Sequence, residues 1–214
     1  MNTCYIFGAA DGLPERFDRE DSDLVIAADA GIRFLEKLNI LPDIAVGDFD
    51  SLGFIPDCKE VIQHPVMKND TDTMLAVKTG FERGFKRFVI YGGAGGRPDH
   101  TYANYQTLCY ISTRGGKGFL CFNGYTATAV RNGSVSFANS ASGNISVFSA
   151  SGKISGVTLK GLLYELDNSV LDFDFPLGVS NEFIGENAEI TVLNGTAIVI
   201  WSGGINDLCE KNIQ

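Results

Sequence analysis

The sequence predicts an α/β protein with two domains, a mostly parallel sheet covered by helices followed by an all-β sandwich. In the first half, short apolar runs alternate with segments of helical periodicity, which is typical of a parallel sheet with helices on both faces. In the second half, short β-rich runs are separated by turn signals, and no segment has a convincing helical period. The 214 residues and the 44% apolar content are enough for two packed domains.

Each element of the first half is predicted from its own pattern. The predicted strands are apolar runs at Cys4–Ala9, Leu24–Ala28, Ile44–Val46, Val61–Gln63, Arg87–Tyr91 and Gly118–Phe122. The predicted helices carry apolar residues every three or four positions, at Gly31–Leu38, Asp72–Arg83 and Thr101–Thr113. This alternation predicts a Rossmann-like domain over residues 1–125.

The second half, residues 126–214, is predicted to form the β-sandwich. Apolar residues alternate around Ile145 and again from Ile190 to Trp201, as they do in strands with one buried face. Trp201 is expected in the core rather than against a substrate. Turns between strands are predicted at Asn132-Gly133, Ser142-Gly143, Ser151-Gly152 and Asn194-Gly195. The pattern changes near residues 123–131, which places the domain boundary there.

Charge and composition exclude several classes of protein. The formal net charge is −9 without Lys/Arg clusters, so nucleic-acid binding is not expected and phosphates would have to be bound through a metal ion and backbone amides. No apolar run approaches the roughly 20 residues that span a membrane. The N-terminus lacks the pattern of a signal peptide, and the five cysteines form no CxxC pair. We therefore expect a cytoplasmic protein with free thiols.

Polar or glycine-rich segments follow the strands of the first half. Because ligands bind beyond the carboxyl ends of strands in open α/β sheets, these segments are candidates for one shared site. They are Asp29-Ala30-Gly31, Gly47-Asp48-Phe49-Asp50-Ser51, Asn69-Asp70-Thr71-Asp72 and Gly92–His100.

Three aspartates are predicted metal ligands. In an extended segment, the spacing of Asp48 and Asp50 points both side chains to one side. Asp72 begins a predicted helix, where it could also act only as a favourable first-turn acid, with Thr71 or Asp70 as the cap. Oxygen ligands suit Mg²⁺, and a divalent cation would remove the repulsion between the carboxylates.

The Gly92–Gly96 run is a candidate phosphate loop, because glycines let backbone N–H groups approach an anion. It is not a Walker A loop, and a plain strand-to-helix turn is the alternative. Arg97 adds a planar guanidinium group whose N–H donors can bind a phosphate. Asp99 could be a helix N-cap, a metal or water ligand, or a base. His100 could pack at the helix start or contact phosphate.

Taken together, these motifs resemble the thiamine pyrophosphokinase family. The matching segments are Ala28–Gly31, Pro42-Asp43 with Gly47–Ser51, Lys68–Asp72, Gly92–His100 and, in the β half, Gly161–Leu166 with Gly178–Phe183. They span both halves in the expected order. Ala30 is a departure, since the family often has a second glycine there.

The resemblance implies a Mg²⁺-dependent enzyme that converts ATP and thiamine to AMP and thiamine diphosphate. It also implies a homodimer in which the catalytic domain of one subunit and the β domain of the other share the thiamine site. The implied roles are Mg²⁺ binding by Asp48, Asp50 and Asp72, catalysis by Asp72, Arg97 and Asp99, nucleotide contacts by Asp29, Gly93, Gly95, Gly96, Arg97 and His100, and thiamine contacts by Ser180 and Asn181.

Two other functions remain open from the residues. A haloacid dehalogenase-type phosphatase also has an apolar strand ending in D-x-D, and it would release phosphate without ATP through a phospho-aspartyl intermediate. A nucleotide- or metal-sensing module would bind ATP and Mg²⁺ without forming AMP.

Overall fold

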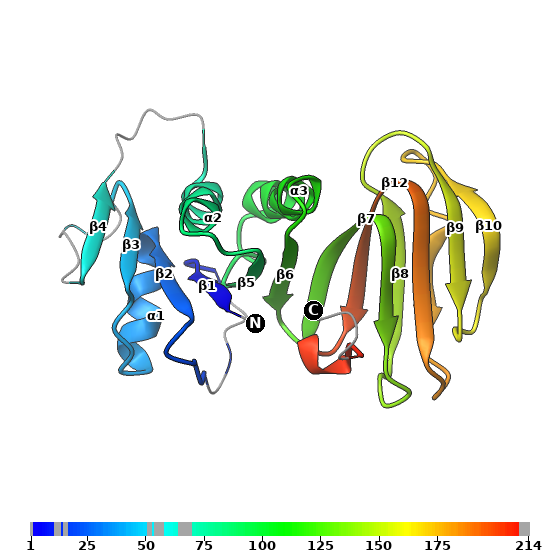
Figure 1. The fold of residues 1–214 in the computed structure, drawn as a ribbon, viewed down its shortest axis with the longest axis horizontal. Helices are drawn as coiled ribbons and strands as arrows, with labels where there is room; N and C mark the ends of the chain where they lie inside the picture. Colours follow the sequence, from blue (N-terminus) through cyan, green and yellow to red (C-terminus); the bar gives the residue numbers. More distant parts are fainter. Residues whose placement is uncertain are drawn as a thin grey trace. The chain divides into compact units, whose positions relative to one another are not determined.

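The computed structural model describes residues 2–10, 14, 17–50, 53, 58–63 and 70–209. Ser51, Lys68 and Asn69 of the motifs above lie outside these described residues. The chain forms two compact units, residues 1–123 and residues 124–214 (Figure 1).

The first unit contains a parallel sheet with the strand order β6-β5-β1-β2-β3-β4. The strands are β1 (Thr3–Phe7), β2 (Leu24–Ala28), β3 (Ile44–Gly47), β4 (Glu60–Gln63), β5 (Arg87–Tyr91) and β6 (Lys117–Phe122). Every neighbouring pair is parallel, as the alternating sequence pattern predicts. From β1 the chain proceeds outward to β2, β3 and β4 and then returns to β5 on the other side of β1. The strand order therefore reverses between β1 and β5.

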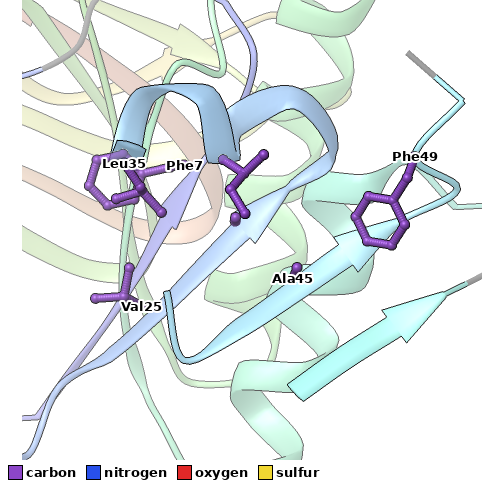
Figure 2. Packing of buried hydrophobic residues seen from close by; sticks show 7 residues of the cluster. Phe7, Val25, Leu35, Ala45 and Phe49 are labelled. Carbon is purple, nitrogen blue, oxygen red and sulfur yellow. The ribbon is translucent and has the colours of Figure 1, made fainter. Parts of the chain in front are cut away.

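Helices lie on both faces of this sheet, which confirms the prediction (Figure 1). The helices are α1 (Ile32–Lys37), preceded by a 3₁₀ turn η1 (Asp29–Gly31), α2 (Asp72–Glu82) and α3 (Pro98–Thr113). Gly80 of α2 lies against Cys4 and Phe88, and Gly118 of β6 lies against Leu108 and Ile111 of α3. On the opposite face, α1 buries Ile32 and Leu35 in a cluster with Phe7, Val25, Ala27, Ala45 and Phe49 (Figure 2).

Asp43, part of the Pro42-Asp43 motif, joins several segments next to β3. Its carboxylate accepts hydrogen bonds from Arg19 (2.7 Å), Lys59 (2.7 Å) and the Val25 N–H (3.0 Å). Burial alone would raise the pKa of Asp43, but the hydrogen bonds from Lys59, Arg19 and Val25 outweigh it and hold the pKa below its usual value. The ionised carboxylate therefore stabilises the first unit.

Replacing Asp43 by asparagine is expected to lower the free energy of unfolding at pH 7 by about 2 kcal/mol, because a charge-assisted network is lost. Since the folded pKa is depressed, this contribution is present above about pH 4, the value of an unfolded aspartate, and is lost as the pH falls through the lower folded pKa. Urea unfolding of both proteins from pH 7 downward measures this, with the exposed Asp18→Asn as control. A difference that stays constant down to pH 3 would contradict the assignment.

The second unit is built from antiparallel strands in its described residues. They are β7 (Tyr125–Phe137), β8 (Asn144–Ser149), β9 (Ile154–Lys160), β10 (Leu166–Leu171), β11 (Gly178–Glu182) and β12 (Ala188–Ser202), followed by the 3₁₀ turn η2 (Ile205–Asp207). β12 pairs with β7 along most of its length, with β9 beside its first part and β8 beside its second. β11 pairs with β8, and β10 pairs with β9.

Two of the predicted turns are wrong. Asn132-Gly133 and Asn194-Gly195 lie inside the long strands β7 and β12, where the pairing shifts register between Val192 and Thr196. The Gly195 N–H donates to Asn132 Oδ1 (2.9 Å), so the two dipeptides lie opposite each other where the regular pairing of β7 and β12 is interrupted. Residues that tolerate positive φ serve a strand bulge as well as a hairpin. The predicted turns at Ser142-Gly143 and Ser151-Gly152 do connect strands.

Trp201 is fully buried, as predicted. Its ring packs edge-on against Phe137, and its indole N–H donates to the Gly204 carbonyl (3.2 Å). It is therefore part of the core of the second unit. In the part of the chain that the structure describes, no helix is long and apolar enough to cross a membrane.

Candidate active site

A cavity of about 360 Å³ lies at the carboxyl ends of the strands of the first unit. The loops after β1 and β5 both line it, which is where the strand order reverses and where open α/β sheets bind their ligands. All six residues predicted for the nucleotide line this cavity, together with Asp72: Asp29, Gly93, Gly95, Gly96, Arg97 and His100. Four segments that are distant in sequence therefore meet at one place.

The loop after β1 also lines the cavity, and sequence reasoning missed it. The Gly8 N–H donates to the Tyr91 carbonyl and the Ala10 N–H to the Gly92 carbonyl, both at 2.8 Å. Gly92 has a φ of 62°, and a methyl group on it would lie 2.5 Å from the Gly8 carbonyl oxygen. The two loops thus touch backbone to backbone. The available signal was a glycine and two alanines directly after the first strand.

The glycine loop leads directly into α3. Arg97 is the N-cap residue and makes no side-chain cap hydrogen bond, and Pro98 is the first helical residue. Asp99 and His100 therefore lie in the first turn, so the interpretation of Asp99 as the N-cap is wrong. Proline is well suited to the first helical position because its φ is fixed and it lacks an N–H. The exposed N–H groups and the dipole of this helix favour an anion beside the loop.

Arg97 and Asp99 form a bidentate ion pair. Arg97 Nη2 lies 2.6 Å from Asp99 Oδ2, and Nε lies 3.2 Å from Oδ1. The hydrogen bond from Arg97 lowers the pKa of Asp99, and the same pair raises the pKa of Arg97. Asp99 is therefore a weaker base than an ordinary aspartate, and its observed contact is to the Arg97 guanidinium at the cavity.

Asp72 lies at the start of α2 and lines the cavity, half-buried. The predicted capping residue Thr71 accepts the Met74 N–H at 3.2 Å through its hydroxyl, so a neighbouring residue fills the cap position. Asp70 pairs with Lys78 at 2.7 Å. Of the two acids, it is Asp72 that the helix places at the cavity.

The Asp48-Phe49-Asp50 segment differs from its prediction. Phe49 has a φ of 60° and is buried in the cluster of Figure 2, so the segment is a turn and not an extended strand. The Asp50 N–H donates to Asp48 Oδ1 (3.1 Å). A left-handed phenylalanine is uncommon and strained, and its burial holds the turn in place. Asp48 and Asp50 are absent from the described lining of the cavity.

The acidic turn is nevertheless adjacent to the cavity. A methyl group on Gly47 would lie 3.2 Å from the Asp29 Cα atom and 3.4 Å from the Phe49 ring, so Gly47 is packed between them. Among the described residues, no group of three or more His, Cys, Asp or Glu side chains is placed to hold a metal ion. Mg²⁺ commonly uses only one or two carboxylates plus waters and substrate phosphates. Asp29 and Asp72 at the cavity fit that requirement.

Ser180 and Asn181 lie in the second unit, on β11. Asn181 is buried, its Nδ2 donates to the Tyr164 carbonyl (2.6 Å), and its Oδ1 accepts the N–H groups of Tyr164 and Glu182, both at 2.9 Å. The Asn181 amide thus joins β11 to the preceding Gly161–Leu166 segment. Ser180 is exposed with a φ of 59°, and its N–H donates to Ser146 Oγ (3.1 Å).

Comparisons with known proteins bear on both halves of the chain. The family model described as "Thiamin pyrophosphokinase, catalytic domain" matches residues 19–119. The model "Thiamin pyrophosphokinase, vitamin B1 binding domain" matches residues 135–197. No curated protein matches the chain.

Several solved structures are similar over most of their length. Thiamine pyrophosphokinase from Bacillus subtilis is 27% identical with a TM-score of 0.84, over 95% of this chain and 100% of that one. A thiamin pyrophosphokinase family protein from Enterococcus faecalis is 26% identical with a TM-score of 0.76, over 95% and 100%. Thiamin pyrophosphokinase from Candida albicans, at 15% identity, a TM-score of 0.72 and coverage of 94% and 89%, shares the fold.

These matches confirm the mixed α/β fold and the resemblance drawn from the motifs. The two family models together cover more than half of the sequence, one in each half, in the order that the motifs predict. The chain therefore belongs to the thiamin pyrophosphokinase family, and thiamine diphosphokinase is its activity.

Proposed function

We propose that the cavity between the loops after β1 and β5 binds ATP and that the chain transfers its pyrophosphoryl group to the hydroxyl of thiamine. One observation carries the proposal: the glycine loop, Arg97, His100, Asp29 and Asp72 line one cavity at the strand-order reversal. Gly93, Gly96 and Arg97 would contact the phosphates. The Gly95 N–H donates to Thr101 (3.2 Å), so Gly95 would contribute through the shape of the loop.

Mg²⁺ would bind with the nucleotide through Asp72, with Asp48 and Asp50 from the adjacent acidic turn. When bound, it would neutralise negative charge on the phosphate oxygens. Asp29 also lines the cavity and lies next to Gly47, so its carboxylate adds negative charge beside Asp72 and the acidic turn. Such an arrangement would let a chain with net charge −9 bind a polyanion, because the acids would bind the metal ion while the loop and Arg97 contact the phosphates.

The transfer forms a bond between the thiamine oxygen and the β-phosphorus and breaks the bond from that phosphorus to the oxygen that leaves with AMP. Such reactions depend mainly on positioning and on charge stabilisation. Arg97 would donate to phosphate oxygens, and Asp99 would hold its guanidinium in position through the bidentate pair. Since its pKa is lowered, Asp99 is better suited to orient groups than to accept the hydroxyl proton.

We assign residues 1–125 to the catalytic, ATP- and metal-binding domain. Residues 126–214 would be a β-sandwich that binds thiamine near Ser180 and Asn181 and forms a homodimer in the cytoplasm. Exposed apolar side chains in and around β10 and β11 support such an interface. They are Leu163, Tyr164, Val170, Phe173, Phe175, Leu177, Val179 and Ile184. The five free cysteines are consistent with a reducing compartment.

The test is an incubation of the purified protein with ATP, Mg²⁺ and thiamine, followed by separation of the nucleotides. We expect AMP and thiamine diphosphate in equal amounts, and only when thiamine is present. ADP in place of AMP would contradict the pyrophosphoryl transfer. Saturable ATP binding without turnover would favour a binding module, and phosphate release from a phosphomonoester without ATP would favour a phosphatase.

A further inference from the structure

Asn104 of α3 is a buried polar residue that contacts the glycine loop. Only 4% of it is exposed, and it lines the cavity. Its Nδ2 donates a hydrogen bond of 2.6 Å to the Gly93 carbonyl oxygen. A buried amide needs a partner, and here the partner is a loop backbone group rather than a neighbouring side chain. Asn104 therefore fixes the direction in which the Gly93 carbonyl points.

One turn earlier on the same helix, Thr101 holds the other end of the loop. Its hydroxyl oxygen accepts the Gly95 N–H (3.2 Å) and its O–H donates to the Arg97 carbonyl (3.2 Å). Thr101 and Asn104 are three positions apart, so they lie on one helical face. Between them they bond to backbone groups of Gly93, Gly95 and Arg97.

We infer that Asn104 and Thr101 are positioning residues that hold the glycine loop in its phosphate-binding shape before ATP arrives. Glycine-rich segments lose much conformational freedom when they are ordered, and a loop that is already fixed avoids that cost on binding. A backbone carbonyl turned toward a phosphate would also repel it, and the bond to Asn104 prevents that rotation of Gly93. The inference rests on the proposed assignment of this cavity to ATP.

The experiment compares steady-state kinetics of the full chain with those of Asn104→Leu, which keeps the branched shape of the side chain and removes the donor. We expect KM for ATP to rise about tenfold or more, because a buried carbonyl is left without its partner and the loop loosens. KM for thiamine should change less than about twofold, because positioning acts on the nucleotide. Thr107→Val is the matched control: Thr107 is buried on the same helix, and its hydroxyl bonds within α3 to Ala103.

Two further variants separate positioning from simple loss of stability. In Asn104→Asp, the ionised carboxylate cannot donate to Gly93, whereas the protonated form can. The ratio of the Asn104→Asp KM for ATP to the wild-type KM should therefore fall as the pH is lowered. The same ratio for Asn104→Leu should not change with pH. Thr101→Ser keeps both hydrogen bonds and should retain the wild-type KM, whereas Thr101→Val should raise it.

The outcomes are distinguishable. Failure of the wild type to form AMP overturns the proposed function itself. With an active wild type, an unchanged KM for ATP in folded Asn104→Leu overturns the inference. So does an equal rise in Thr107→Val, since loss of any buried polar group would then have the same effect. Urea unfolding of each variant shows whether the protein measured is folded.

Discussion

Asp72→Asn is expected to lower kcat by at least about a hundredfold while the protein stays folded. Asp72 is the first residue of α2, is half-buried and lines the cavity with the glycine loop. Removing a carboxylate that would bind Mg²⁺ costs several kcal/mol of charge stabilisation on the phosphates, and each 1.4 kcal/mol is about tenfold in rate. The helix should survive, because Thr71 is the residue that caps it. Nucleotide separation and urea unfolding measure the two effects.

Glu82→Gln is the matched control, because Glu82 is the last residue of the same helix and is absent from the described lining of the cavity. It should keep wild-type kcat. The same assay on Asp50→Asn tests whether the acidic turn after β3 joins the metal site when ATP is bound. A comparable loss would support the three-aspartate assignment. Near-normal turnover of Asp72→Asn would remove Asp72 from the catalytic residues.

Gly92→Ala is expected to abolish most of the activity and to destabilise the first unit by about 3 kcal/mol or more. A side chain at the left-handed φ of Gly92 costs roughly 1–2 kcal/mol. The added methyl group would also lie 2.5 Å from the Gly8 carbonyl oxygen and 2.9 Å from that of Ala10. Backbone atoms cannot rotate away as side chains do, so the loops after β1 and β5 must separate. Both loops line the cavity, and catalysis should fall with stability.

Gly84→Ala isolates the conformational part of this effect. Gly84 has a φ of 85°, and a methyl group there would meet no atom within 4 Å. It should lose about 1 kcal/mol of unfolding free energy and keep its turnover number. If Gly92→Ala behaved no worse than Gly84→Ala in urea unfolding and in the AMP assay, close packing of the two loops would not matter for the site.

Three residues in or beside the predicted sites have left-handed backbone without being glycine. Asp29, Phe49 and Ser180 have φ values of 48°, 60° and 59°. Such conformations are sparsely populated, and they persist only where surrounding packing holds them. Aspartate tolerates this region better than most residues, but residue type argues against it for Phe49, and the sequence predicted an extended Asp48–Asp50 segment. Burial of the Phe49 ring, which depends on residues far along the chain, overrode that local preference (Figure 2).

Asn181 illustrates the same difficulty in the second unit. The residues alone favour an ordinary β-turn at Ser180-Asn181, and only the family resemblance assigns the pair to thiamine. In the structure, Asn181 Nδ2 donates a hydrogen bond to the Tyr164 carbonyl, and Asn181 Oδ1 accepts the backbone N–H groups of Tyr164 and Glu182. Which groups a buried amide satisfies is decided by segments that fold against it, and no local pattern contains that information.

The sequence by itself determined the elements of the first unit and the chemistry of its loops. Hydrophobic periodicity is a local property, so strands and helices appear close to their predicted ranges, and polar segments at strand ends identify the edge where the cavity lies. Only the tertiary structure decided the strand order, which brings Gly8–Ala10 next to Gly92. It also decided that β7 and β12 continue as single strands through two positions where turns were predicted. These depend on pairing between distant segments, whose energy local patterns do not encode.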